Sequence, residues 1–152
     1  MTGAALVLIV AACVDLGLHS PVPTQTTPTP PPSPNCTAPA GPGVNWSGCD
    51  LRGANLSGAN LTDVILEGAD LRHAQLDNAL LRNAHLHGAV LTEAVLTEAV
   101  LSGADLSSVD LGDADLSGAN LSSVISGGIT GSPKALPSYW RLIDGHLVPP
   151  GV

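Results

Sequence analysis

The residues whose chemistry depends most on their surroundings in this 152-residue chain are its three cysteines, Cys13, Cys36 and Cys49. Outside the cytoplasm, Cys36 and Cys49 are able to form a disulfide, which would close a loop of about fourteen residues and contribute up to about 3 kcal/mol. In the alternative interpretation, Cys49 is simply a small buried residue and Cys36 stays free. The sequence leaves both interpretations open.

Two of the five histidines and the many serines are the next candidates for reactive side chains. His85 and His87 flank Leu86, and with Glu67 they suggest at most a weak metal site, because a third fixed ligand is missing. Ordinary surface histidines are the better interpretation. The serines occupy turn positions and are expected to form turns. No nucleophile elbow, phosphate loop or zinc-hydrolase signature occurs, so we expect no catalytic residue, no metal and no cofactor.

A leucine recurs at every fifth residue from Leu51 to Leu121, and a small residue, usually alanine, stands two positions before each leucine. A period of five fits neither an α-helix nor a β-strand. It indicates one structural unit per five residues, stacked as a solenoid with leucine at its centre. The chain has no Phe and only 2% aromatic residues, which a leucine-filled tube explains.

Units such as Ala54-Asn55-Leu56-Ser57-Gly58 and Ala104-Asp105-Leu106-Ser107-Ser108 resemble the A-(D/N)-L-x-x unit of the pentapeptide-repeat family. The resemblance implies an all-β fold, a right-handed quadrilateral parallel β-helix over residues 44–126 with four units per coil. Residues twenty apart would then stack. Because a solenoid has two open ends, we expect both ends to need covering.

The N-terminal residues predict export. Residues 3–13 are wholly apolar and too short to span a bilayer, as in the core of a signal peptide. Val10-Ala11-Ala12-Cys13 resembles the lipobox of bacterial lipoproteins, which implies a signal peptide over 1–12 and a lipid on Cys13. The alternative is a buried apolar strand with a chance cysteine, and no Lys or Arg precedes the run.

Residues 13–43 are rich in Pro and Thr, and nine of the thirteen prolines lie between Pro21 and Pro42. This composition favours extended, unpacked conformations, so we expect a disordered linker that tethers the solenoid. Cys49 occupies an inward, small position of the first coil. A bond from Cys36 would therefore fold the end of the linker over the open end of the solenoid, where Trp46 stands in the leucine register.

The outward position before each leucine is usually polar, but it is apolar in part of the solenoid. These apolar residues either reflect β-propensity on a pleated surface, the interpretation we favour, or form a contact band for a partner or a second copy of the chain. The members of this candidate surface are Leu80, Val90, Val95 and Val100.

Acidic residues dominate the second half of the repeats, and the whole chain has a net charge of −8. Such a surface argues against direct nucleic-acid binding, because neutralising phosphates requires basic side chains. Some pentapeptide-repeat proteins mimic DNA and inhibit gyrase, so the resemblance implies this role as an alternative. The acidic residues of the candidate surface are Glu93, Glu98, Asp105, Asp110, Asp113 and Asp115.

The repeat ends at Ser126, where a leucine is due, and residues 127–152 resemble a tail found between repeat blocks in related bacterial proteins. Asp144-Gly145 between two apolar runs predicts a β-hairpin. We expect this hairpin to cap the last coil through Leu136, Tyr139, Trp140 and Ile143.

Together these features predict a non-enzymatic scaffold or protein-interaction module, anchored as an extracytoplasmic bacterial lipoprotein. The partner is a protein of unknown identity, with a homodimer as an alternative, and the lipid provides the contact with the membrane. A cytoplasmic inhibitor of a DNA-handling enzyme such as gyrase is the alternative function.

Overall fold

The computed structural model describes residues 33–151, which belong to a compact unit running from Pro31 to Val152. The predicted signal peptide (1–12), the lipidation site Cys13 and the linker up to residue 32 lie outside the described residues. Within 33–151, no helix has the length and apolar character needed to cross a membrane.

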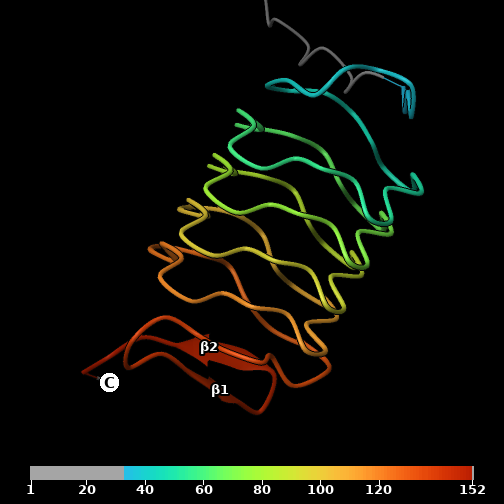
Figure 1. The fold of residues 1–152 in the computed structure, drawn as a ribbon. Coiled ribbons are helices and arrows are strands. Elements are labelled where there is room, and N and C mark those ends of the chain that lie inside the picture. The colour runs from blue at the N-terminus through green and yellow to red at the C-terminus, as the bar shows by residue number, and fades with distance from the viewer. Residues whose placement is uncertain (1–32, 152) are drawn as a thin grey trace, which may run out of the picture. The chain divides into compact units, whose positions relative to one another are not determined.

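Parallel β-bridges join residues that lie twenty positions apart, from Asn45–Ile65 to Asp115–Ala135. Backbone hydrogen bonds flank each bridge; for example, Leu71 N donates to Val90 O over 2.8 Å. Twenty residues contain four pentapeptides, so each unit stacks on the unit four places along. The result is the series of stacked coils in Figure 1.

Leucine and alanine side chains fill the inside of the coils. Each leucine of the five-residue register from Leu61 to Leu116 is fully buried, and so are the small residues two positions before each leucine from Leu66 on. The inward positions predicted from the period of five are therefore confirmed. Leu51, in the first coil, is only partly buried, because no further coil covers it.

A tight turn follows each leucine and forms a corner of the coil. At one such corner, Ala94 N donates to Leu91 O over 3.0 Å, and only the third residue, Glu93, has a positive φ, of 57°. This is the pattern of a type II turn, which glycine fits best. Gly58 holds this position at another corner, with a φ of 66°. Glu98 holds it at a third corner with a φ of 57°, although its Cβ disfavours this conformation.

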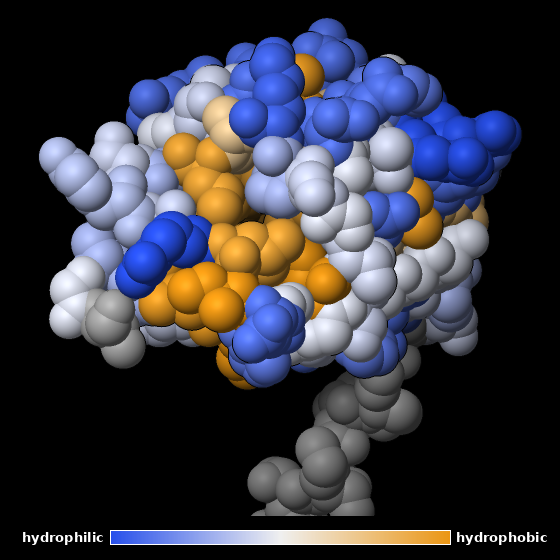
Figure 2. All heavy atoms as spheres, turned by 90° about the horizontal axis from the view of Figure 1, so that it is seen from below, coloured by the Kyte–Doolittle hydropathy of each residue, from blue (hydrophilic) through white to orange (hydrophobic). Residues whose placement is uncertain are grey.

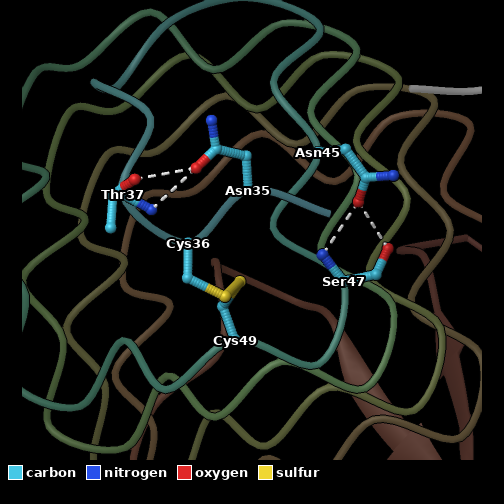
Figure 3. The surroundings of a disulfide bond; sticks show 6 residues. All are labelled: Asn35, Cys36, Thr37, Asn45, Ser47 and Cys49. Carbon is cyan, nitrogen blue, oxygen red and sulfur yellow. Dashed lines mark hydrogen bonds between the residues drawn. A yellow bond between two sulfur atoms is a disulfide. The ribbon is translucent and has the colours of Figure 1, made fainter. Parts of the chain in front are cut away.

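Residues 33–43, which we call the N-terminal strap, make defined contacts at the beginning of the solenoid. Cys36 and Cys49 form a disulfide with a Cα–Cα distance of 5.5 Å, and Asn35 N donates to Asn45 O over 2.9 Å. Figure 3 shows the two cysteines joined inside the outline of the coils, close to Asn45. The prediction of a disordered linker up to residue 43 therefore differs from the structure for residues 33–43, because the disulfide fixes them.

The bridge ladder does not end at residue 126 but continues to Ala135. In this last part Ser126 replaces a leucine, and Ile129 and Leu147 supply buried apolar side chains. The backbone hydrogen bonds of the coil therefore outlast the leucine pattern, because they do not depend on side-chain type.

The strands β1 (Arg141–Ile143) and β2 (His146–Val148) form an antiparallel hairpin beside the last coil, as Figure 1 shows. Leu147 N donates to Ser126 Oγ over 3.1 Å, and Gly145 O accepts from Ile129 N over 3.1 Å. Leu147 is buried, and Leu142, its partner in the hairpin register, packs against the core.

Two of the residues expected to cover the last coil point away from it. Tyr139 is 83% exposed and Ile143 is 42% exposed, whereas Leu136 and Trp140 pack against the core. Side chains alternate between the two faces of a strand, so the inward position of Leu142 places Ile143 outward. The expectation was wrong for Tyr139 and Ile143, and Leu147 takes the inward place.

Candidate functional site

The four outward apolar residues are divided among three sides of the coil. Leu80 bridges to Val100, so these two are neighbours on one side. Val90 lies between Asp70 and Asp110 on a second side. The structure therefore supports a girdle of half-buried residues and no broad apolar patch.

Val95 is the fourth of these residues and lies on a third side. It bridges to Gln75 and to Asp115, so polar side chains bound it in both directions. Val95 is therefore part of a largely charged surface, together with Glu93, Asp115 and Lys134.

Three of the six predicted acidic residues hold their own turns. Asp105 accepts hydrogen bonds from the backbone N and the hydroxyl of Ser107, and Asp115 accepts the same two bonds from Ser117. These bonds lower the pKa values of both carboxyl groups. Asp110 accepts from Gly112 N over 3.0 Å. Because these carboxylates already accept hydrogen bonds within their own turns, they stabilise the turns and are less available to a partner.

The other three acids, Glu93, Glu98 and Asp113, are exposed at corners with positive φ. Glu93 and Asp113 lie twenty apart and stack along one corner. They belong to a shallow depression that we call the acidic groove, formed by Glu93, Ala94, Val95, Asp113, Asp115 and Lys134. Lys134 Nζ lies 3.3 Å from Asp115, so the one base of this groove already has an acidic partner.

A second depression lies two coils earlier on the same corner. Arg52 pairs with Asp50 over 2.6 Å and lies 3.8 Å from Asp70, which pairs with Arg72. The hydrogen bonds from Arg52 lower the pKa of Asp50 to about 2. We call this depression the arginine pocket; it is formed by Asp50, Arg52, Gly53, Arg72 and His73.

A contact between His73 and Glu93 joins the two depressions, since His73 Nδ1 lies 3.2 Å from Glu93 Oε2. Sequence reasoning did not identify this pair or the role of Lys134. The spacing of twenty between residues 73 and 93 was the available signal. The unit of His87 stacks on that of Glu67, since Gly68 N donates to His87 O over 2.9 Å, and His87 Nδ1 lies 2.8 Å from Ser107 Oγ on the other side.

The sequence analysis also did not identify an apolar surface at the hairpin end. Figure 2 shows apolar side chains gathered on this end. The large apolar residues exposed there or close to it are Ile125, Tyr139 and Ile143. Within residues 33–151, no group of three His, Cys, Asp or Glu side chains is placed to hold a metal ion.

Comparison with known proteins gives the family of this chain. The family model for pentapeptide repeats matches in eight copies, over residues 42–68, 69–107 and 84–122. A pentapeptide repeat protein from the thylakoid lumen of Arabidopsis thaliana is 34% identical, with a TM-score of 0.54. The match covers 56% of this chain and 59% of that protein, so the chain spans less than two thirds of its length.

Two cyanobacterial structures also match. A pentapeptide repeat protein from Cyanothece 51142 is 29% identical, with 64% of this chain and 59% of that chain covered and a TM-score of 0.34. One from Nostoc PCC 7120 is 30% identical, with 64% and 78% covered and a TM-score of 0.35. No curated protein matches. Because the family model covers more than half of its residues, the chain belongs to the pentapeptide-repeat family.

Proposed function

We propose that this chain is a non-enzymatic scaffold or protein-interaction module, held outside the cytoplasm by a lipid on Cys13. The observation that carries the location is the Cys36–Cys49 disulfide. Disulfides persist in oxidising compartments and are rare in the cytosol. The apolar run before Cys13 agrees with export, since its length suits a signal peptide.

The body of the module is a right-handed, four-sided solenoid whose last coil is capped by the β1–β2 hairpin. The bridges between residues twenty apart support four units per coil. The burial of Leu147 and its backbone bond to Ser126 support the role of the hairpin as a cap. A rod of this kind presents fixed ladders of side chains, which suits recognition of a partner.

The partner that fits the exposed corner is a protein with a basic surface. Glu93 and Asp113 are exposed at this corner, and Lys134 is paired with Asp115. Opposite charges on a partner would accelerate association and select among competing surfaces. Serine hydroxyls do not suggest hydrolysis, because Ser107 and Ser117 donate to the carboxylates of their own turns.

A cytoplasmic inhibitor of a DNA-handling enzyme is the second candidate. The exposed carboxylates of Glu93, Glu98 and Asp113 favour it, because an acidic surface can occupy a site that receives DNA phosphates. The disulfide favours the first candidate, since an oxidised pair is not expected where gyrase works.

Fatty-acid labelling in cells tests the proposal. The native chain is expected to take radiolabelled fatty acid into the membrane fraction, and Cys13→Ala is expected to lose the label. Cys36→Ala is the matched control and should keep it, because Cys36 lies after the lipid site. A native chain that stays unlabelled, soluble and uncleaved would contradict the proposal. A gyrase supercoiling assay with the native chain and Glu93→Gln would then test the second candidate.

A further inference from the structure

The N-terminal strap covers only one part of the first coil. Cys49 of the disulfide is 1% exposed, and Trp46, three residues before it, is 3% exposed. Leu51 occupies the same core register one unit later, yet it is only partly buried, and so are Ala54 and Ala59. Leu56, in the same coil, is 7% exposed, so the first coil is unevenly covered. We attribute the deep burial of Trp46 to the strap, because Cys49, which the disulfide joins to Cys36, donates its backbone N to Trp46 O.

The disulfide is the covalent link that fixes the strap. Two backbone hydrogen bonds also join the strap to the coils: Asn35 N donates to Asn45 O over 2.9 Å, and Gly43 N donates to Thr62 O over 2.9 Å. The side chain of Asn35 accepts from the N and the hydroxyl of Thr37, so these two bonds stay within the strap. They order the strap without attaching it.

The covered state leaves one polar group unsatisfied. Trp46 Nε1 is buried and has no hydrogen-bond acceptor among the described residues. A buried N–H without an acceptor opposes burial, because it loses its hydrogen bond to water. Displacing the strap would let water bond to Trp46 Nε1, so the hydration of this group favours the open state.

We propose that the Cys36–Cys49 disulfide is a redox latch, which a dithiol reductant opens by attack on Cys36 and which thereby exposes the Trp46 end of the solenoid. Cys36 is an exposed residue and Cys49 is a buried one, so an incoming thiolate approaches the disulfide from the Cys36 side. This inference rests on the described residues alone and does not depend on the proposed lipid anchor.

The exchange proceeds in two steps. The reductant thiolate bonds to Cys36 Sγ, the S–S bond breaks, and Cys49 leaves as a thiolate that takes up a proton. The second thiolate of the reductant then attacks the reductant's own sulfur in the mixed disulfide and releases Cys36, which is protonated. The reductant becomes a disulfide and the protein gains two electrons and two protons. A dithiol is required because the Cys49 thiolate stays beside Cys36 and can re-form the original bond, so the mixed disulfide must be resolved quickly.

The solenoid itself is expected to survive reduction. Cys49 occupies the small inward position that alanine holds in most other units, and a free thiol in this place behaves as a small apolar residue. The ladder bonds of the neighbouring residues, such as Leu51 N to Asp70 O, do not involve the strap. Opening therefore joins Trp46 to Leu51, Ala54 and Ala59 in one uncovered end, which is available to a partner.

The test uses the full chain with Cys13→Ala, which leaves two cysteines, and with Trp140→Phe, which leaves Trp46 as the only tryptophan. Dithiothreitol is the reductant and iodoacetamide the label. Reduction is expected to shift Trp46 emission to the red, increase its quenching by acrylamide and leave the far-ultraviolet circular dichroism unchanged. Cys36 should be alkylated rapidly, and Cys49 should stay protected until the chain unfolds.

Two variants without the disulfide serve as controls. Cys36→Ser and Cys49→Ala should both show the emission of the reduced chain, without reductant, and both should keep the circular dichroism of the oxidised chain. Unchanged Trp46 emission after reduction would overturn the latch, because the strap would then stay closed. Loss of the dichroism signal, or equal labelling of Cys36 and Cys49 in the folded chain, would also overturn it.

Discussion

Replacing Leu91 by alanine tests the physical basis of the solenoid. Leu91 is fully buried, and its neighbours twenty residues away, Leu71 and Leu111, are fully buried as well. The cavity left by the substitution is enclosed by backbone that cannot collapse, because Leu91 N donates to Asp110 O and Leu71 N donates to Val90 O. We therefore expect a loss in the upper part of the usual range, about 3–5 kcal/mol of unfolding free energy.

Leu51→Ala is the matched control. The residue type and the register are the same, but Leu51 lies in the first coil and is only partly buried. Its truncation removes less buried area and leaves a site open to water, so about 1–2 kcal/mol is expected. The difference between the two variants isolates the contribution of enclosure.

Urea unfolding followed by circular dichroism measures both variants. The midpoint should fall much further for Leu91→Ala than for Leu51→Ala, with little change in the slope against urea. Equal losses at the two positions would refute the reasoning, because they would mean that the end of the solenoid is as enclosed as its centre. A loss below about 1 kcal/mol at Leu91 would show that the coils can relax around the cavity.

Three further predictions concern the corners, the charges and the hairpin. Glu98→Gly should raise the unfolding free energy, measured in urea, by up to about 1 kcal/mol, because the residue at this positive φ would no longer carry a Cβ. A loss of stability would contradict the turn assignment. The carboxyl of Asp50 should titrate near pH 2 by NMR, so its stabilisation is complete above the ordinary value of about 3.9 and is lost as pH falls toward 2. Arg52→Ala should return this midpoint toward 3.9, and an unchanged midpoint would exclude Arg52 as the cause. Leu147→Ala should cost about 2–4 kcal/mol and Tyr139→Ala about 0.5 kcal/mol or less by thermal unfolding, and the reverse order would contradict the hairpin packing.

The candidate site shows which contacts can be predicted from the sequence pattern. Asp110 and Val90 were placed in one row by the spacing of twenty, and the bridges confirm that row. The contact between His73 Nδ1 and Glu93 Oε2 follows the same spacing, but it also depends on how the two side chains are oriented at exposed corners. Such side-chain directions vary with the space around each corner, and the sequence alone does not define that space.

The repeated part of this protein can be predicted from its sequence alone. A leucine every fifth residue, with a small residue two positions before it, permits only a narrow stacked core, and Leu61 to Leu116 are buried as this pattern requires. The matches to the pentapeptide-repeat family rest on the same regularity. Repetition makes the prediction possible, because every unit meets the same neighbours.

The arrangement of the two ends became clear only in the folded structure. At the beginning, the structure joins Cys36, an exposed residue, to Cys49, a buried one. At the end, it turned Leu147 inward and Tyr139 outward, against expectation. The physical reason is that the ends lack the repeating neighbour. Their packing depends on which side chains fit the last open coil, and no local pattern encodes that fit.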